Sequence, residues 1–329
     1  MNVTVKTYAN IALLKYWGKR DETLFLPTKN SLSLSLDALA TTTTITFANS
    51  DAHAISVHNM IPDEKTIGPI RSFLDHVRKT FAINQYFSLS THNSFPTAAG
   101  IASSASGFAA LTIGINTLCS LGLSQKELSI VARQGSGSAA RSLFGGFVWW
   151  HKGTQPNGAD SYAQDLFTST HWPELRVLIV ITQAERKATS SRYGMAQTIK
   201  TSPIYHQWLE ESAKREQLFI TAVAQKDFCT LGALTEQEWD GFHQSIIRSS
   251  PTLCYWNQES YALIKHVQQL REKGLPCFFT TDAGPQVKII CLEKNSDAIQ
   301  QSITQNFPTT TIIESGIASH PFVNTHEHC

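Results

Sequence analysis

The stretch NSFPTAAGIASSASG, residues 93–107, decides how the rest of the sequence is interpreted. All but two of its residues are Ala, Gly, Ser, Thr, Pro or Asn, and the apolar segment FAALTIGINTLCSLG that follows is typical of a buried helix. A loop of small residues at a helix start presents unpaired backbone N–H groups, and the helix dipole adds partial positive charge there. The stretch therefore favours an anion-binding loop, with hydroxyl donors from Ser103, Ser104 and Ser106.

The same residues also fit a plain turn before a core helix, and the loop alone leaves that alternative open. The Walker motif GxxxxGK[ST] does not occur in this sequence, so a P-loop of that class is excluded.

Length and composition predict a globular protein of two domains. The chain has 329 residues, of which 42% are hydrophobic and 16% charged. Its 27 basic and 26 acidic residues give a net charge of +1, which gives no indication of nucleic-acid or membrane binding, so any anion site must be local. The sequence lacks a signal-peptide pattern and an apolar run of about 18 residues, so we expect a cytoplasmic protein.

The six cysteines form no CxxC motif and mostly lie in apolar stretches, so we expect reduced core residues. The C-terminal HEHC, residues 326–329, has a composition that can bind metal, but a solvated terminus is the expected state. No dedicated metal site is predicted.

Periodicity predicts strands and one long helix in the first half of the chain. Strict alternation in SLSLSLD, Ser31 to Asp37, is typical of a half-buried strand, and residues 67–81 have helical spacing. Ser124 and Glu127 form a capping box for a helix that ends near Gln134. The other expected elements are strands at 87–91, 145–150 and 175–181, with a polar loop at 152–172 and the last strand closing the first domain.

The second half predicts long helices followed by short strands, which indicates a second α+β unit. The helices are expected at 191–201, 203–225, 227–248 and 257–273, and the strands begin at Cys277, Val287 and Thr309, with a helix between the last two. We therefore expect an N-terminal domain over residues 1–185, a C-terminal domain over 186–329, and a cleft between them.

Two cationic motifs in the first domain are candidate anion sites. ANIALLKYWGKRD, residues 9–21, brings Lys15, Tyr16, Lys19 and Arg20 near Asn10. This pattern fits the solvated basic face of a strand end as well as a phosphate contact, since an ammonium and a phenol both donate to phosphate oxygens.

QGSGSAARSLFGGFVWW, residues 134–150, places Ser136, Ser138 and Arg141 in a turn of small residues. A dinucleotide fingerprint is rejected because a capped helix, and not a strand, precedes its GxGxxA spacing. The planar fork of Arg141 matches a carboxylate at two points, although a solvated arginine on a turn remains an alternative.

Two further motifs come from the second half. RKATSSRYGM, residues 186–195, starts a helix near Ser190 or Ser191, so Ser191 is either an N-cap or an anion ligand. FFTTDAGPQVKII, residues 278–290, places Asp282 between an apolar strand and a Gly-Pro turn, which fits an Asx turn or a site carboxylate.

Together these five segments resemble the small-molecule kinases of the galactokinase, homoserine kinase, mevalonate kinase and phosphomevalonate kinase group. Their sequences are most similar to the motifs of the mevalonate diphosphate decarboxylase branch. The resemblance implies an α+β fold with an N-terminal ribosomal-protein-S5-domain-2-like domain and a C-terminal ferredoxin-like domain. It also implies an ATP-binding loop and its neighbours, namely Pro96, Ala98, Ala99, Gly100, Ile101, Ala102, Ser103, Ser104, Ser106 and, more weakly, Lys187.

The resemblance implies a catalytic role for Asp282, Arg141 and Ser191. Asp282 would face the tertiary hydroxyl of mevalonate 5-diphosphate, and Arg141 would bind its carboxylate. The residues implied to bind substrate are Asn10, Tyr16, Lys19, Ser136, Ser138, Arg141 and Arg192. The usual family motif at this point is DAGPN, and this sequence has Gln286 in place of the final Asn, which weakens any role given to that position.

The implied reaction is an ATP-dependent decarboxylation of mevalonate 5-diphosphate to isopentenyl diphosphate through 3-phosphorylation. ATP and Mg²⁺ are the implied cofactors, and related enzymes are usually homodimers. The alternative is a related kinase, or a phosphomevalonate decarboxylase, that acts on another mevalonate derivative.

Overall fold

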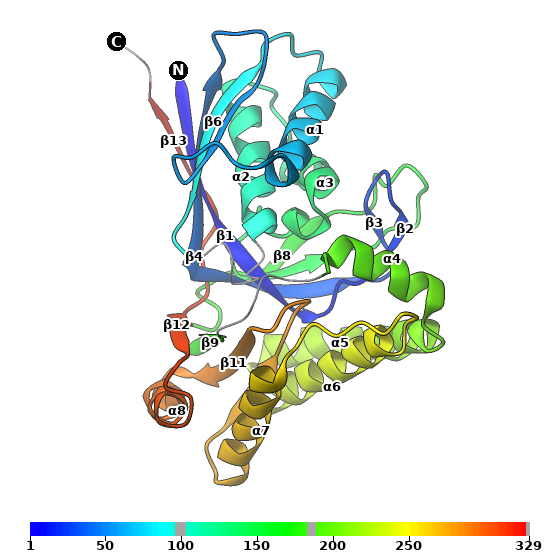
Figure 1. Cartoon of the computed structure of the whole chain (residues 1–329), viewed down its shortest axis with the longest axis vertical. Coiled ribbons are helices and arrows are strands. Elements are labelled where there is room, and N and C mark those ends of the chain that lie inside the picture. Colours follow the sequence, from blue (N-terminus) through cyan, green and yellow to red (C-terminus); the bar gives the residue numbers. More distant parts are fainter. Residues whose placement is uncertain (96–102, 183–188, 327–329) are drawn as a thin grey trace.

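The computed structural model describes residues 1–95, 103–182 and 189–326, and its mixture of helices and two large sheets confirms the α+β class (Figure 1). The strands are β1 (Asn2–Leu14), β2 (Lys19–Asp21), β3 (Leu26–Pro27), β4 (Ser31–Phe47), β5 (Ala54–Val57), β6 (Phe87–Asn93), β7 (Phe147–Trp150), β8 (Ala163–Phe167), β9 (Leu175–Ile181), β10 (Cys277–Thr280), β11 (Val287–Leu292), β12 (Thr311–Ser315) and β13 (Phe322–His326). The helices are α1 (Glu64–Thr80), α2 (Ser103–Leu118), α3 (Gln125–Gly135), α4 (Ser191–Thr201), α5 (Tyr205–Gln225), α6 (Phe228–Ile247), α7 (Gln258–Glu272) and α8 (Glu293–Asn306), with a short 3-10 helix at Gly137–Ala140.

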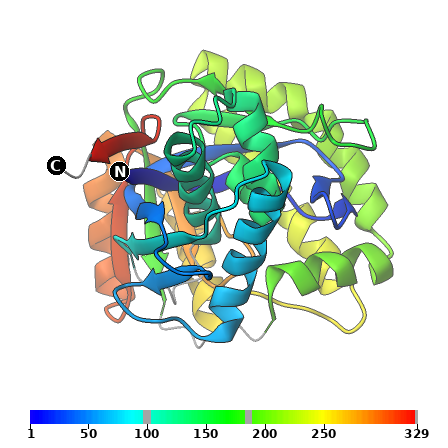
Figure 2. The ribbon, with the colours of Figure 1, turned by 90° about the horizontal axis from the view of Figure 1, so that it is seen from above.

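The first sheet has the order β13-β1-β4-β6-β5, and β7 and β8 extend it from β4. Helices α1, α2 and α3 lie together on one face of it, as the two views in Figure 1 and Figure 2 show. The central helix α2 packs on β1 and β4 because its apolar side chains are buried against Val5 and Ile45. The chain returns at its end to pair β13 with β1, so His326 lies in an exposed strand, and the rest of the HEHC segment lies outside the described residues.

The second sheet has the order β10-β11-β9-β12, and α5 to α8 lie on the same side of the molecule as this sheet (Figure 1). Strand β9 pairs with both β11 and β12, so the prediction that this strand closes the first domain is wrong. Its continuous apolar sequence is explained by burial on both faces, since Leu178 and Val180 belong to the cluster formed with α7 and α8, while Val177 and Ile179 belong to the cluster that includes α5 and α6. The division of the chain at residue 185 stays a prediction.

The alternation at Ser31–Asp37 predicted a half-buried strand, and this prediction is wrong. Ser31, Ser33 and Ser35 are as completely buried as the leucines between them, within a single strand of 17 residues. The polar face is covered because the Ser35 hydroxyl donates to Phe144 O at 2.8 Å and Ser31 contacts Arg141. Serine in this strand therefore marks a buried polar interior and not a solvated face.

Other local predictions have mixed outcomes. The capping box of α3 is formed as predicted, whereas the expected loop at 152–172 contains strand β8. Among the cysteines, Cys277 and Cys291 are buried as expected, but Cys229 and Cys254 are exposed.

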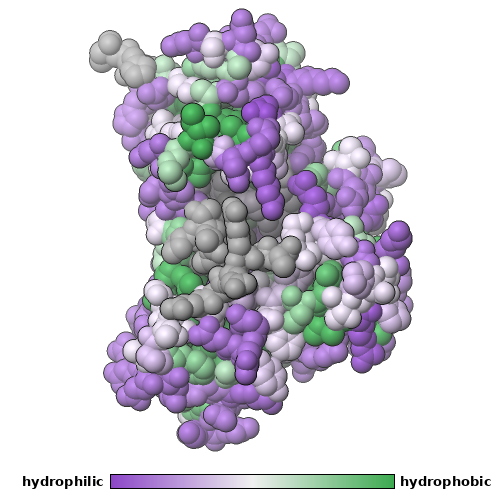
Figure 3. All heavy atoms as spheres, viewed as in Figure 1, coloured by the Kyte–Doolittle hydropathy of each residue, from purple (hydrophilic) through white to green (hydrophobic). Residues whose placement is uncertain are grey.

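In the described ranges no helix is both long and apolar enough to cross a membrane, and the face in Figure 3 is largely hydrophilic.

Candidate active site

One polar cavity of about 460 Å³ gathers the predicted site residues from both halves of the chain. Its lining includes almost every site residue predicted within the described ranges, namely Asn10, Tyr16, Lys19, Ser104, Ser136, Ser138, Arg141, Ser191, Arg192 and Asp282. Four cations, Lys15, Lys19, Arg141 and Arg192, and one carboxylate, Asp282, belong to this described lining. The cavity is therefore suited electrostatically to a multiply charged anion.

The predicted phosphate loop is only partly described. Residues Pro96, Ala98, Ala99, Gly100, Ile101, Ala102 and Lys187 lie outside the described residues, and Ser103 begins α2. Ser104 lies in the cavity wall with its Oγ 3.4 Å from Ser136 Oγ. The prediction that Ser106 contributes to the anion-binding loop is wrong. Ser106 is fully buried with its Oγ 2.6 Å from Thr41 Oγ1, so it joins α2 to β4.

Arg141 is a buried cation whose guanidinium is oriented by Asn10 and Ser31. Its Nε and Nη2 donate to Asn10 Oδ1 at 3.3 and 3.2 Å, and Nη1 donates to Ser31 Oγ at 2.5 Å. Asn10 is itself fixed, since its Nδ2 donates to Ser142 Oγ at 2.8 Å. Burial lowers the pKa of Arg141 to about 10, against the opposing effect of Asp282. No carboxylate of the described chain lies within ion-pair distance of this guanidinium, so its fork is available to an anionic ligand.

Asp282 follows β10 and lies between two buried ammonium groups. Lys15 Nζ is 3.0 Å from its Oδ1, and Lys288 Nζ is 3.2 Å from its Oδ2. Burial alone would raise the pKa of Asp282, but the two lysines together hold that pKa well below its usual range. The carboxylate is therefore ionised at neutral pH and able to accept a hydrogen bond from a ligand hydroxyl.

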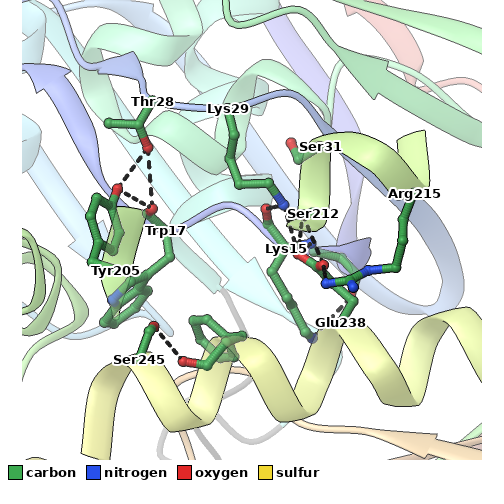
Figure 4. A network of polar contacts seen from close by, with 12 residues as sticks. Lys15, Trp17, Thr28, Lys29, Ser31, Tyr205, Ser212, Arg215, Glu238 and Ser245 are labelled. Atoms are coloured by element: carbon green, nitrogen blue, oxygen red, sulfur yellow. Dashed lines mark hydrogen bonds and ion pairs between the residues drawn. The ribbon is translucent and has the colours of Figure 1, made fainter. Parts of the chain in front are cut away.

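Lys15 is held by Asp282 and also through its own backbone, whose contacts with Lys29 and Glu238 are drawn in Figure 4. It follows the last residue of β1, where sheet pairing ends, and its N–H donates to Glu238 Oε1 at 3.3 Å. Lys29 Nζ donates both to Lys15 O at 2.8 Å and to Glu238 Oε1 at 2.6 Å. Ser212 and Arg215 of α5 complete the shell of Glu238 at 2.8 and 3.1 Å. The C-terminal helices thus fix the position from which Lys15 reaches the site.

The next residues of this loop are fixed in the same way. Trp17 O accepts from Tyr205 Oη at 3.0 Å, and Trp17 Nε1 donates to Thr198 Oγ1 of α4 at 3.1 Å. Gly18 has φ +106, and the Tyr205 hydroxyl occupies the space that a Cβ at position 18 would need. Only glycine therefore allows this close approach of the loop to α5.

Tyr16 and the turn of small residues pack against each other. The Tyr16 hydroxyl is buried without a hydrogen-bond partner among the described residues, and it lies where a Cβ on Gly137 would be. The Tyr16 ring contacts Trp150, with ring centroids 4.7 Å apart. Burial raises the pKa of Tyr16 beyond its ordinary value, so the phenol is neutral and can donate to an anion.

Helix α4 opens into the cavity through Ser191 and Arg192. Its N-cap is Ser190, whose hydroxyl accepts from Tyr193 N at 3.2 Å, so the capping alternative for Ser191 is excluded. The start of the helix adds partial positive charge to the cationic side chains, which favours an anion there.

A second, apolar cavity of about 260 Å³ adjoins the polar one, since Pro69, Ser104 and Phe108 line both. Its other walls come from β4, β5, β6 and α1, through side chains such as Val57, Ile70 and Leu89. A ligand with a planar apolar part and an anionic part would fit both compartments across Ser104.

The segment before Asp282 is fixed by a buried aromatic cluster. Thr281 Oγ1 lies 2.7 Å from His243 Nε2 and accepts from Trp239 Nε1 at 2.8 Å. His243 is 1% exposed, and its pKa is lowered to about 3 by burial and also by the nearby charge of Lys15. The imidazole is therefore neutral in the folded protein, and its burial makes stability depend on pH.

We expect acid to destabilise the fold through His243 well before the carboxylates titrate. Because its pKa is lower in the folded than in the unfolded chain, the unfolded chain takes up the proton first, and stability falls as pH decreases below about 6.5. Replacing His243→Gln should make the loss between pH 6.5 and 5 smaller by about 2 kcal/mol. Urea unfolding at the two pH values measures this difference, and parallel losses in both proteins would contradict the assignment.

Sequence reasoning missed two lysines of the site. The motifs predict no individual role for Lys15, which lies in a basic stretch, and none for Lys288, which lies inside the strand VKIICL. A single lysine within an otherwise apolar buried strand is a signal, because a buried ammonium needs an acid partner nearby. Gln286, which replaces the family Asn, is buried and accepts from Thr182 N at 2.7 Å, so it joins two segments of the C-terminal half.

No group of three or more His, Cys, Asp or Glu side chains that could hold a metal is present among the described residues. The cavity offers one carboxylate and several hydroxyls, which suits Mg²⁺ carried mainly by phosphate oxygens and water and not a protein cage.

The chain matches family models over both halves. Residues 7–163 match a model described as the diphosphomevalonate decarboxylase-like N-terminal domain, and residues 177–327 match the mevalonate 5-diphosphate decarboxylase C-terminal domain. A diphosphomevalonate decarboxylase of Candida albicans is 37% identical over 320 residues, which cover 93% of this chain and 88% of that protein.

Solved structures are similar along the whole chain. MDDEF in complex with MVAPP, AMPPCP and magnesium has a TM-score of 0.94 and 36% identity, and the match covers 99% of each chain. The mevalonate diphosphate decarboxylase of Enterococcus faecalis, in a structure that concerns its mevalonate diphosphate-mediated ATP binding, has a TM-score of 0.93 and 35% identity, again with 99% of each chain covered.

Proposed function

Because the chain belongs to the diphosphomevalonate decarboxylase family, we propose that its polar cavity phosphorylates and decarboxylates mevalonate 5-diphosphate with the side chains named above. The reaction converts this substrate and ATP into isopentenyl diphosphate, ADP, phosphate and carbon dioxide. The observation that supports the assignment of roles is that one ionised carboxylate, Asp282, and one buried arginine, Arg141, line the same cationic cavity.

Asp282 orients the tertiary hydroxyl of the substrate for phosphoryl transfer. Its carboxylate accepts the hydroxyl hydrogen bond, while Lys15 and Lys288 keep it ionised and fixed. A carboxylate with a lowered pKa is a weak base, so the proton leaves late, when the phosphoryl group has already made the hydroxyl acidic. Phosphorylation then turns a poor leaving group into a good one.

Arg141 binds the substrate carboxylate through the part of its fork not used by Asn10 and Ser31. The hydroxyls of Ser136, Ser138 and Tyr16, together with Lys19, Ser191 and Arg192, surround the diphosphate. When phosphate departs, positive charge develops at C3 and the diphosphate stabilises it. Loss of carbon dioxide from the held carboxylate forms the alkene.

ATP enters with its phosphates toward Ser104 and the start of α2, and its adenine fits the apolar cavity beside α1. Two similar solved structures support this, since one contains AMPPCP and magnesium and the other concerns ATP binding. Mg²⁺ would offset the charge of the transferring phosphates when bound, held by those phosphates, water and the hydroxyls of the cavity.

Incubation with ATP and mevalonate 5-diphosphate tests the proposal. Formation of isopentenyl diphosphate with equal amounts of carbon dioxide, phosphate and ADP is expected. ADP without carbon dioxide and phosphate would instead favour a kinase of the same superfamily, and turnover of mevalonate 5-phosphate alone would favour a phosphomevalonate decarboxylase.

Arg141→Lys should damage catalysis more than nucleotide binding. Lysine keeps one charge but cannot bond Asn10, Ser31 and a substrate carboxylate at once, because it lacks the planar fork. We expect kcat/KM for mevalonate 5-diphosphate to fall about a hundredfold and KM for ATP to stay within about twofold. Steady-state kinetics measures both, and unchanged kcat and KM would remove Arg141 from this role.

We further propose a cytoplasmic homodimer in which the first sheet and its helices carry the ATP loop and the C-terminal half of the chain, from β9 onward, supplies Asp282. Analytical ultracentrifugation of the purified protein gives the oligomeric state directly, and a monomer at micromolar concentration would contradict it.

A further inference from the structure

Phe25 adopts a strained backbone conformation in the wall of the polar cavity. It is the last turn residue before β3 in the β2–β3 hairpin, and its φ is +54. A bulky side chain is rarely found in this left-handed region, because Cβ approaches the following carbonyl. Such strain persists where the surroundings impose it, and it occurs often at binding sites.

The surroundings of Phe25 impose this conformation through the preceding residue. Leu24 N donates to Asp21 Oδ1 at 2.7 Å, and Leu24 O accepts from Arg133 Nε at 2.9 Å. Arg133 is fully buried and also donates to Gly158 O at 3.1 Å, so it anchors the turn to the body of the protein. With both backbone groups of Leu24 fixed, Phe25 is turned toward the cavity.

The Phe25 ring contacts two cations that come from opposite halves of the chain. Lys19 Nζ of β2 lies 4.1 Å from the ring centroid, and Arg192 Cζ of α4 lies 5.3 Å from it. Both distances are typical of cation–π contacts. Burial lowers the pKa of Lys19, Glu22 opposes this, and the charge of Arg192 lowers it further, so the two cations are close enough to repel each other.

An aromatic ring is suited to hold two like charges without neutralising them. A carboxylate in this place would pair with the cations and compete with an anionic ligand, whereas the ring attracts each cation through its quadrupole and carries no charge. Lys19 and Arg192 therefore stay oriented toward the cavity, where both belong to the lining, at little electrostatic cost to an entering anion.

We propose that Phe25 is a positioning and specificity residue that holds Lys19 and Arg192 as a pair, so that the site binds a diphosphate better than a monophosphate. The inference rests on the proposed function, in which these two cations surround the substrate diphosphate. A diphosphate has enough oxygens and charge to bind both cations. A monophosphate binds one of them and leaves the other in contact with the Phe25 ring only.

Phe25→Asn is the decisive variant, because Asn tolerates positive φ and lacks the ring. We expect KM for mevalonate 5-diphosphate to rise about tenfold with a much smaller change in kcat and KM for ATP. Thermal stability should not fall, since relief of backbone strain offsets the lost packing. A residue with only a structural role would lower stability and leave the substrate preference intact.

Two matched variants separate the ring from the strain. Phe25→Leu keeps the bulk and the strained backbone but loses the ring, so it should raise KM as Phe25→Asn does while losing stability. Phe25→Tyr restores an aromatic face and should keep KM within about twofold of the parent. A parent-like KM in the Asn and Leu variants, or an equal rise in KM for ATP, would overturn the proposal.

Calorimetry with inorganic pyrophosphate and with inorganic phosphate tests the same pair without turnover. The parent should bind pyrophosphate more tightly than phosphate, and Phe25→Asn should reduce that ratio about tenfold. An unchanged ratio would refute the role of Phe25 even if the enzyme is active. Absence of isopentenyl diphosphate with the parent, alongside a reduced ratio in the variant, would instead count against the proposed function alone.

Discussion

Asp282→Asn is expected to lower kcat about a thousandfold while ATP affinity changes by no more than about threefold. The amide has nearly the shape of the carboxylate but cannot take the hydroxyl proton. It also leaves Lys15 and Lys288, both nearly fully buried, without their shared counter-ion, so the already lowered pKa of Lys15 falls further. Rapid-quench measurement of ADP and isopentenyl diphosphate, with nucleotide binding by calorimetry, checks both parts.

Lys288→Met is the matched control for this result. It removes one of the two ammonium partners of Asp282 but keeps the carboxylate, and Lys288 is not among the described residues that line the cavity. A loss of about tenfold is expected, because Lys15 still holds Oδ1 at 3.0 Å. Comparable rates for Asp282→Asn and the parent protein would remove Asp282 from the mechanism.

Glu238→Gln is expected to cost about 3–5 kcal/mol of the free energy of unfolding. Glu238 is fully buried and is the only acid within ion-pair distance of Lys29 among the described residues, while Lys29 itself is 3% exposed. Burial already lowers the pKa of Lys29, and Glu238 opposes that shift. Removing the negative charge leaves a buried ammonium without a counter-ion, and this destabilises a protein more than replacing both members of the pair.

The same cluster provides its own controls. Arg215→Gln removes a partner of Glu238 that is 16% exposed and should cost only about 1 kcal/mol. The double variant Lys29→Met with Glu238→Gln should recover part of the loss, because both members of the pair are then neutral. Urea unfolding of the four proteins measures these differences, and equal losses for Glu238→Gln and Arg215→Gln would contradict the assignment.

Glu238→Gln should also reduce kcat, because Lys15 N–H donates to Glu238 and Lys15 O accepts from Lys29. These two backbone contacts determine where the Lys15 ammonium meets Asp282. The buried cluster around Glu238, drawn in Figure 4, therefore stabilises the C-terminal helices and also fixes the loop that carries Lys15.

Local patterns in the sequence predicted what depends on local forces. Capping residues and periodic apolar side chains predicted the helices of the C-terminal half to within a few residues, because hydrogen bonds within a helix are set by near neighbours. The same approach failed for Ser31–Asp37 and β9, since alternation or apolarity does not say which elements cover each face.

The sequence by itself determined the family, the fold class and most of the charged and hydroxyl-bearing side chains that line the cavity, because these are carried by short motifs in a fixed order. Only the tertiary structure decided that Asp282 lies between Lys15 and Lys288, that Ser106 turns to Thr41 and that Phe25 contacts two cations. The reason is physical: the charge state and orientation of a side chain depend on burial and on partners hundreds of residues away, such as Lys15 and Asp282, which are separated by 267 positions.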